Sequence, residues 1–255
     1  PSEYGIAEID VSYTIRRFKE KPGPGEIFSN LASTGIYVCS PDIFSFIPPD
    51  TKFDFARDLF PLLMAEGHRL QAWLARGNWT DVGSPASLRQ AQRWKLDELS
   101  FSSFMGDISI TGGQITGPVM FGTAVTIGRN CRITGPVAIG SGTSIENDVL
   151  IGPYTSIGEN CTIRSRAKIF SSHIHNGVTL GRDSTASGSI IDNGTRIGEF
   201  CSVENDTVIG PRVEIRDRSV IHSKTRIWPD VVVPKESVVS EHLLNDNYDT
   251  RTAGS

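Results

Sequence analysis

The sequence predicts two kinds of fold in one chain: an α/β segment over residues 1 to 100 and a longer all-β segment after it. From residue 115 onward an apolar residue recurs every six positions, which is a repeat of short strands. The first hundred residues lack that period and alternate strand-like with helix-like patterns. Apolar residues make up 38% of the chain and charged residues 21%, which is the balance of a folded globular protein.

The six-residue period is the strongest pattern in the sequence. Isoleucine, or once phenylalanine, occupies every sixth position from Ile115 to Ile169, and isoleucine or valine does so again from Ile191 to Val233. The period slips by one residue twice between residues 170 and 190, where we expect irregular corners or a small bulge. The repeat ends before residues 241–255, which we expect to form a C-terminal tail.

Each six-residue unit contains one short strand and one corner. A small or β-branched residue follows each aliphatic residue by four positions, and an even offset on an extended strand points both side chains to one face. Glycine and asparagine, which tolerate turn conformations, lie between the strands. The pattern resembles the hexapeptide-repeat family, whose chains form a left-handed parallel β-helix with three units per coil. This resemblance implies a β-helix of about seven coils within residues 107–240.

Composition excludes several classes of protein. The net charge is −4 with no basic stripe, so nucleic acid is not an expected partner. No apolar stretch approaches the roughly 20 residues of a membrane span, and no signal peptide is visible. The four cysteines are far apart, which disfavours zinc and disulfides and favours a cytoplasmic location. Cys131, Cys161 and Cys201 occupy small-residue positions of the repeat and are expected to be buried.

The first hundred residues are expected to form an α/β domain, with the junction to the β-helix at residues 97–108. The expected elements are, in order, a hairpin over residues 4–21, a strand over 33–40, a helix over 54–67, a strand over 69–75 and a helix that is capped by Ser84 and runs to about residue 99.

Five short motifs give this first segment a resemblance to a known family. They are YGI with EID from Tyr4, FKEKP from Phe18, SN-x3-TGIYV from Ser29, FDF-x2-DLFP-x-L from Phe53, and G-x-W-x-DVGSP from Gly77. Their order and spacing are similar to those of the second half of the sugar-1-phosphate nucleotidyltransferases, with mannose-1-phosphate guanylyltransferase as the nearest group. In several branches of that family a Rossmann-like catalytic domain is followed by a left-handed β-helix. The resemblance implies that residues 1–100 are the C-terminal half of such a catalytic domain.

The resemblance implies a sugar-phosphate site in this segment. The backbone of Gly5 would approach the sugar, and Glu20 would accept hydrogen bonds from sugar hydroxyls. Lys21 would neutralise the phosphate, while Thr34 and Gly35 would line the same pocket. Taken without the resemblance, Glu20 and Lys21 would be a solvated pair of charges at a turn.

The resemblance also implies a magnesium ligand. Asp81, at a strand end just before a helix, matches the carboxylate that binds the catalytic Mg²⁺. Magnesium takes one or two carboxylates together with phosphate oxygens and water, so a single aspartate is chemically sensible. Taken alone, Asp81 would be a turn or helix-cap residue.

The implied reaction transfers a nucleotidyl group from an NTP, with GTP favoured, to a sugar 1-phosphate, with mannose 1-phosphate favoured. The family's glycine-rich, arginine-bearing nucleotide loop does not occur in this sequence, so we expect the 255-residue chain alone to be inactive. The β-helix is expected to form a homo-oligomer. Two alternatives stay open: a catalytically silent regulatory or structural paralogue, and a hexapeptide-repeat acyltransferase that would use a histidine such as His173, His175 or His222 as base.

Overall fold

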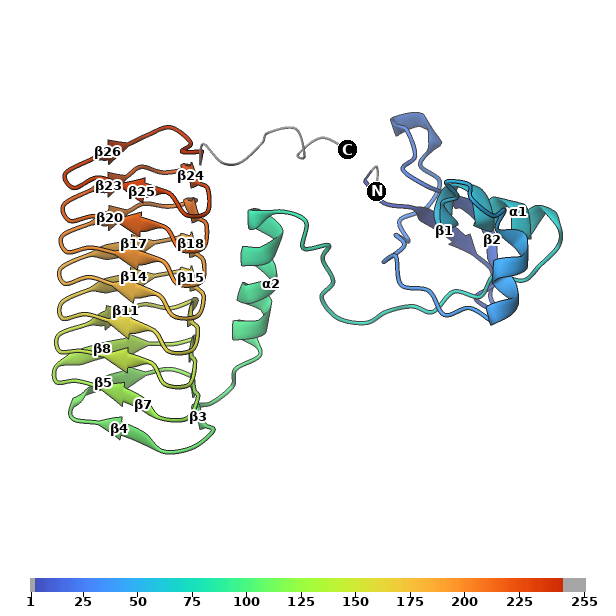
Figure 1. Ribbon diagram of the computed structural model, residues 1–255. Coiled ribbons are helices and arrows are strands. Elements are labelled where there is room, and N and C mark those ends of the chain that lie inside the picture. Colours follow the sequence, from blue (N-terminus) through green and yellow to red (C-terminus); the bar gives the residue numbers. More distant parts are fainter. Residues whose placement is uncertain (1–2, 245–255) are drawn as a thin grey trace. The chain divides into compact units, whose positions relative to one another are not determined.

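The computed structural model describes residues 3–244, and these form two compact units that divide between Asp81 and Val82 (Figure 1). The first unit is built on a β-hairpin and the second contains the β-helix. The division lies earlier than the end of the α/β segment expected over residues 1–100. The helix expected at the end of that segment groups with the β-helix, because its side chains contact the β-helix directly.

The hairpin expected over residues 4–21 is present. Strands β1 (Ile6–Ile9) and β2 (Ile15–Lys19) pair antiparallel. The carboxylate of Asp10 closes the turn, because it accepts hydrogen bonds from the Ser12 hydroxyl and from the backbone N–H of Thr14. These two bonds, led by the Ser12 hydroxyl, hold the pKa of Asp10 well below its usual range.

The helix expected over residues 54–67 is also present, as a π-helical turn, Phe55–Leu59, that continues into α1 (Phe60–Ala65). Asp54 caps it, since its carboxylate accepts the N–H groups of the next turn at 2.8 Å. Leu59, Phe60 and Leu63 bury their side chains in the core of the first unit. Two 3-10 turns complete this unit, at Pro24–Glu26 and Pro41–Phe46.

The prediction of two further strands in the first unit, over residues 33–40 and 69–75, is wrong. Residues 33–40 pair with another segment only at Ser33, and residues 69–75 contribute a single β-bridge through Gln71. A strand needs a partner for its backbone N–H and C=O groups, and within residues 3–244 no backbone hydrogen bond is formed by Ile36 or Val38. Their side chains are 74% and 100% exposed as a result.

The second unit is a left-handed parallel β-helix of eight coils, whose strands form three parallel sheets (Figure 1). Sheet 1 contains β3 (Ser103–Phe104), β6 (Val119–Phe121), β9 (Val137–Ile139), β12 (Thr155–Ile157), β15 (His173–Ile174), β18 (Ile190–Ile191), β21 (Val208–Ile209) and β24 (Arg226–Ile227). Sheet 2 contains β4 (Ile108–Ile110), β7 (Val125–Ile127), β10 (Ser144–Ile145), β13 (Thr162–Ile163), β16 (Thr179–Leu180), β19 (Arg196–Ile197), β22 (Glu214–Ile215) and β25 (Val232–Val233). Sheet 3 contains β5 (Gly113–Thr116), β8 (Cys131–Thr134), β11 (Leu150–Ile151), β14 (Lys168–Phe170), β17 (Thr185–Ser187), β20 (Ser202–Val203), β23 (Val220–Ile221) and β26 (Val238–Val239).

The β-helix has one coil more than the seven expected, because it begins before the regular period. Phe104 pairs with Phe121 and Ile110 with Ile127, the interior residues of the next coil, although Phe104 and Ile110 themselves are 57% and 43% exposed at this end of the β-helix. Only five positions separate Ile110 from Ile115, so the regular six-residue period begins after these two strands. At the other end Leu243 pairs with Ile227 and extends the last coil. The rest of the expected tail, residues 245–255, lies outside the described residues.

The two slips in the period are corner irregularities, as expected. Ile157 pairs with Ile174 across the first slip and Ile174 pairs with Ile191 across the second, and both registers are one residue shorter than the usual eighteen. Both shortened corners lie between sheet 3 and sheet 1 in successive coils. The shorter corners turn Ser172 and Ser189 inward, where their hydroxyl oxygens lie 3.3 Å apart.

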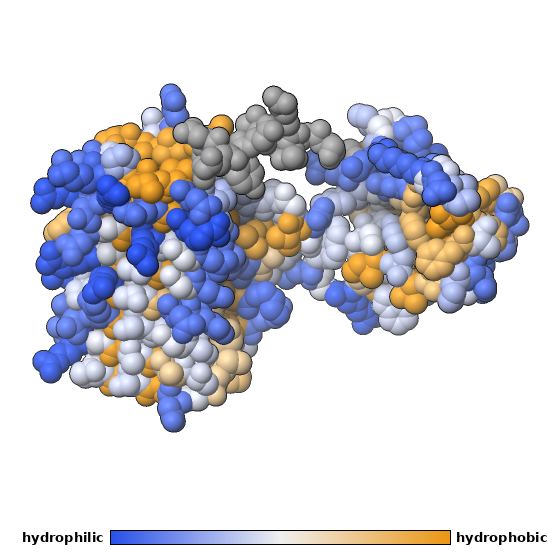
Figure 2. Space-filling view, viewed as in Figure 1, coloured by the Kyte–Doolittle hydropathy of each residue, from blue (hydrophilic) through white to orange (hydrophobic). Residues whose placement is uncertain are grey.

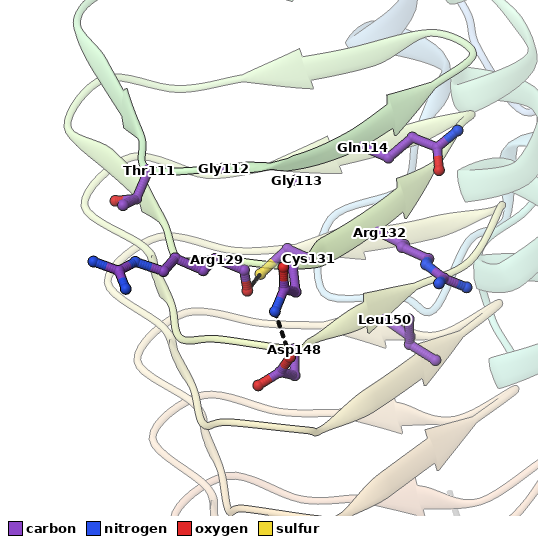
Figure 3. Close-up of a pocket in the computed structure, with 10 residues that line it drawn as sticks. Thr111, Gly112, Gly113, Gln114, Arg129, Cys131, Arg132, Asp148 and Leu150 are labelled. Atoms are coloured by element: carbon purple, nitrogen blue, oxygen red, sulfur yellow. Dashed lines mark hydrogen bonds between the residues drawn. The ribbon is translucent and has the colours of Figure 1, made fainter.

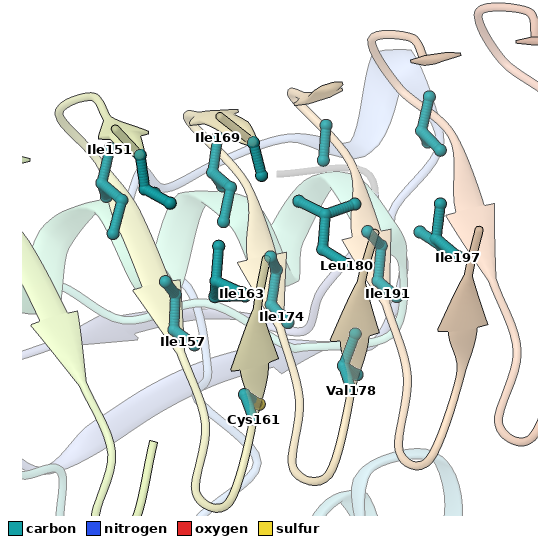
Figure 4. Close-up of a cluster of buried hydrophobic side chains, with 14 of the residues drawn as sticks. Ile151, Ile157, Cys161, Ile163, Ile169, Ile174, Val178, Leu180, Ile191 and Ile197 are labelled. Carbon is teal, nitrogen blue, oxygen red and sulfur yellow. The ribbon is translucent and has the colours of Figure 1, made fainter. Parts of the chain in front are cut away.

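Stacked aliphatic side chains fill the interior of the β-helix (Figure 4). Ile163 and Leu180 are fully buried and lie in layers directly above one another. The three cysteines of the repeat are buried as expected, and burial raises the pKa of each thiol: Cys131, Cys161 and Cys201. Their thiols are therefore structural rather than reactive.

Helix α2 (Pro85–Asp97) begins at Ser84, as expected. The Ser84 hydroxyl accepts the N–H of Ser87, and the Ser87 hydroxyl accepts the N–H of Ser84, which forms a reciprocal cap. Within residues 3–244, no helix is long and apolar enough to cross a membrane.

Helix α2 lies along sheet 1 of the β-helix (Figure 1). The side-chain amide of Gln92 donates to the Ser156 hydroxyl at 3.0 Å and to the backbone C=O of Ser172 at 3.2 Å. Arg89 forms an ion pair with Asp206 at 2.5 Å. Two polar contacts on different coils therefore fix both the position and the direction of the helix.

Candidate functional site

Gly5 and Glu20, two residues implied by the resemblance, lie in contact. The pairing of Ile6 with Lys19 places the residue before β1 beside the residue after β2. Gly5 is buried, and a Cβ atom added to it would lie 2.6 Å from Oε2 of Glu20 and 2.7 Å from Cζ of Phe18. A side chain larger than that of glycine would therefore have to displace the Glu20 carboxylate or the Phe18 ring. The expected approach of a sugar to the Gly5 backbone stays a prediction.

Lys21 follows Glu20 at the point where the chain leaves β2. It is exposed, with φ of 43°, and its ammonium forms no ion pair within residues 3–244. Glu26 instead holds the following turn, since its carboxylate accepts the N–H of Gly23 at 3.0 Å and pairs with Lys19 at 3.2 Å. The Gly23 N–H and then the Lys19 charge lower the pKa of Glu26. The Lys21 charge is therefore available to an anionic ligand.

Thr34 and Gly35 lie on the segment that hydrogen-bonds to Gly5. The N–H of Ser33 donates to the C=O of Gly5 at 2.7 Å, and Gly35 has φ of 73°, which glycine adopts without strain. Thr34 is half-buried. A cavity of about 600 Å³, which the sequence did not indicate, opens beside Gly35 and is lined by Tyr37, Cys39, Ser40, Ile43, Phe44, Phe53, Asp54 and Phe55.

Asp81 is the last residue of the first unit and its side chain is exposed. The ring of Trp79 packs edge-on against the ring of Tyr4, with the ring centroids 5.3 Å apart. This contact holds the segment just before Asp81 next to Tyr4, the neighbour of Gly5. The described part of the chain contains no group of three histidine, cysteine, aspartate or glutamate side chains able to hold a metal. A single exposed carboxylate fits a magnesium ion that takes its other ligands from phosphate and water. No described contact joins Asp81 to Glu20 or Lys21.

His173, one of the three histidines that an acyltransferase could use as base, lies at the contact with α2. Its Nδ1 is 2.6 Å from the Ser156 hydroxyl, which also accepts the Gln92 amide. Burial, and then the charge of His175, lower the pKa of His173 to about 4. The imidazole is therefore neutral near pH 7 and serves the packing of α2.

The stability of the second unit is expected to fall as the pH drops from 6.5 toward 4. In that range an unfolded His173 binds a proton and the folded one does not, so acid favours unfolding; below about 4 both forms are protonated and no further loss occurs. The loss is on the order of 2 kcal/mol, allowing for the partial exposure of the ring. Urea denaturation at pH 7 and at pH 4.5 measures it. The His173→Asn variant should lose this pH dependence and His68→Asn should keep it; equal pH dependence in both variants would contradict the assignment.

Family models match most of the chain. Residues 1–98 match the family described as nucleotidyl transferase, and residues 133–244 match the one described as the GMPPB C-terminal domain. The first match contains the candidate site, and the second lies entirely within the β-helix.

Curated relatives carry three different activities in their names. The chain is 34% identical to a UTP–glucose-1-phosphate uridylyltransferase of Synechocystis sp.. The alignment of 181 residues covers 71% of this chain and 45% of the relative. It is 27% identical to the probable mannose-1-phosphate guanylyltransferase 3 of Oryza sativa subsp. japonica, over 95% of this chain and 59% of that one. It is 28% identical to a glucose-1-phosphate adenylyltransferase of Desulfitobacterium hafniense, over 90% and 59%. The chain thus spans about half the length of these relatives.

Proposed function

Because the chain belongs to the sugar-1-phosphate nucleotidyltransferase family, we propose that it is part of an enzyme that makes a nucleotide sugar. A phosphate oxygen of the sugar 1-phosphate attacks the α-phosphate of an NTP, and pyrophosphate leaves. In this proposal the first unit supplies the sugar-phosphate half of the site. The observation that carries it is the contact of the Glu20 carboxylate with the bare backbone of Gly5, inside the segment that matches the family.

The proposed roles follow from the chemistry of each group. Glu20 accepts hydrogen bonds from sugar hydroxyls that reach the Gly5 backbone, and Lys21, which forms no ion pair within residues 3–244, neutralises the phosphate. Thr34 and Gly35, held to Gly5 through Ser33, line the same pocket. Asp81 would contribute one carboxylate to a Mg²⁺, which supplies charge neutralisation at the phosphates.

Among the possible substrates we propose GTP and mannose 1-phosphate. The support is the guanylyltransferase-type family model, which matches residues 133–244, together with guanylyltransferases of rice and Arabidopsis thaliana that align with more than 90% of the chain. We further propose that the β-helix joins copies of the chain into a homo-oligomer, because sheets 2 and 3 each align eight parallel strands in a regular stack that a second copy could contact. A cytoplasmic location stays a prediction.

The test separates binding from catalysis. We expect the 255-residue chain to bind mannose 1-phosphate, measured by isothermal titration calorimetry, but to release no pyrophosphate from GTP and this sugar. Glu20→Gln should weaken binding about tenfold or more, because a hydrogen bond to a charged acceptor is lost. Glu8→Gln, an exposed glutamate of β1, is the matched control and should bind normally.

Two outcomes would reject parts of the proposal. Binding that is absent, or that Glu8→Gln and Glu20→Gln weaken equally, would remove the sugar-phosphate site and favour a structural paralogue. Pyrophosphate release above background would show that the chain is active by itself.

A further inference from the structure

One corner of the β-helix, between sheet 2 and sheet 3, does not close at its first coil. In the later coils the corner residue has positive φ and donates its N–H to a C=O of the preceding coil, at 2.8–3.1 Å, from Asp148 through to Glu236. No such bond joins Asn130 to Thr111, within the range of residues described. Among the described residues, the backbone N–H of Asn130 therefore has no acceptor in the first coil.

The cause is one missing residue. Ile110 pairs with Ile127 and Gly113 pairs with Cys131, so two residues turn this corner in the first coil where three do so in the second. Gly113 has φ of 152°, and a Cβ added there would lie 2.7 Å from the backbone oxygen of Cys131. The shortened corner therefore leaves a groove of about 870 Å³ (Figure 3). On the side of the first coil, its wall includes the backbone of Gly112 and Gly113.

The groove is flanked by two arginines that have no carboxylate partner within residues 3–244. Arg129 and Arg132 extend to opposite sides of the corner (Figure 3), and neither side chain forms an ion pair in the described region. Elsewhere along this corner an arginine pairs with the next coil, as Arg166 does with Asp183 at 2.7 Å. Among the described residues, the two guanidinium groups next to the groove are thus not held in ion pairs.

The groove has an excess of positive charge. The Asp148 carboxylate also lines it and accepts a hydrogen bond from the side-chain amide of Asn130 at 3.2 Å, so two arginines face one aspartate. Thr111 and Gln114 add a hydroxyl and an amide to the lining. Guanidinium groups bind phosphate oxygens in a fork, and an unpaired backbone N–H at a positive-φ corner adds a further anion donor.

We propose that this corner groove, formed by Gly112–Gly113 and Asn130 and flanked by Arg129 and Arg132, is a binding site for a phosphoryl group of a small anionic ligand. It lies in the β-helix unit, and the inference does not rest on the proposed sugar-phosphate site of the first unit. Arg129 precedes Asn130 in the chain and Arg132 follows it, so each guanidinium group would have to turn toward a phosphoryl group held at the Asn130 N–H.

The test uses the 255-residue chain and inorganic phosphate, at constant ionic strength set with sodium chloride. We expect saturable shifts of the amide NMR signals of Gly112, Gly113 and Asn130, with affinity on the order of 1 mM. The double variant Arg129→Gln and Arg132→Gln should weaken this binding about tenfold or more. Phosphate bound at Lys21 would shift amide signals of the first unit, and such shifts are not evidence for the corner groove.

The control is Arg196→Gln. Arg196 is also an exposed arginine of the β-helix without a described side-chain partner, but it lies on β19 of sheet 2, far along the stack. It should leave the shifts unchanged. Equal weakening by Arg196→Gln would show non-specific attraction to positive charge, and either that result or unshifted signals at Gly112, Gly113 and Asn130 would overturn the proposal.

Discussion

Replacing Gly5 by alanine is expected to remove most of the binding of a sugar 1-phosphate. The new methyl group would lie 2.6 Å from the Glu20 carboxylate and 2.7 Å from the ring of Phe18, so at least one of these side chains must move. Displacing Glu20 removes a charged acceptor, and we expect affinity to fall about tenfold or more. The crowding should also destabilise the first unit by about 1–3 kcal/mol.

The matched control is Gly25→Ala. A Cβ atom at Gly25 meets no atom within 4 Å, and Gly25 lies only a few residues beyond Lys21. Calorimetric titration and thermal unfolding of both variants separate the two effects. Normal affinity in Gly5→Ala would mean that the close contact of Gly5 with Glu20 has no part in binding.

Replacing Ile163 by alanine is expected to cause the largest loss of stability in the β-helix. Ile163 is fully buried and pairs with Ile145 below it and Leu180 above it. A cavity at such a site costs about 2–5 kcal/mol. Each coil of a repeat protein is stabilised by its neighbours, so a loss in a middle coil weakens two interfaces.

Thr162→Ala is the control for this substitution. Thr162 precedes Ile163 on the same strand, and alternation turns its side chain to the outer face, where it is half-buried. Urea denaturation followed by circular dichroism should show little change for Thr162→Ala and an earlier transition for Ile163→Ala. Equal midpoints would contradict the inward position of the period-six residues.

The β-helix could be predicted from the sequence because its fold is local and repeated. The aliphatic residues from Ile115 to Val233 each occupy an equivalent interior position, so one period determined the core, the corners and the buried cysteines. The first coil was missed because the spacing from Ile110 to Ile115 is five. The same missing residue opens the corner groove, so that irregular spacing was the signal available for it.

The first unit was harder to predict, because strands depend on partners that are distant in sequence. Ile36 and Val38 have a strand-like pattern, but the pattern does not show whether another strand is present to pair with them. The position of α2 on the β-helix also could not be predicted from the sequence, because it depends on the ion pair of Arg89 with Asp206, more than a hundred residues away. The family motifs imply that Gly5 and Glu20 serve one site, but neither the motifs nor the spacing predicted that the two residues lie in contact.

The most direct test of the central claim is to titrate the chain with mannose 1-phosphate and record which amide NMR signals move. We expect saturable shifts at Gly5, at Glu20 and Lys21, and at Thr34 and Gly35, with the β-helix signals beyond the corner groove unchanged. That result would place the sugar-phosphate site in the first unit. Shifts confined to the β-helix, or none at saturating ligand, would contradict it.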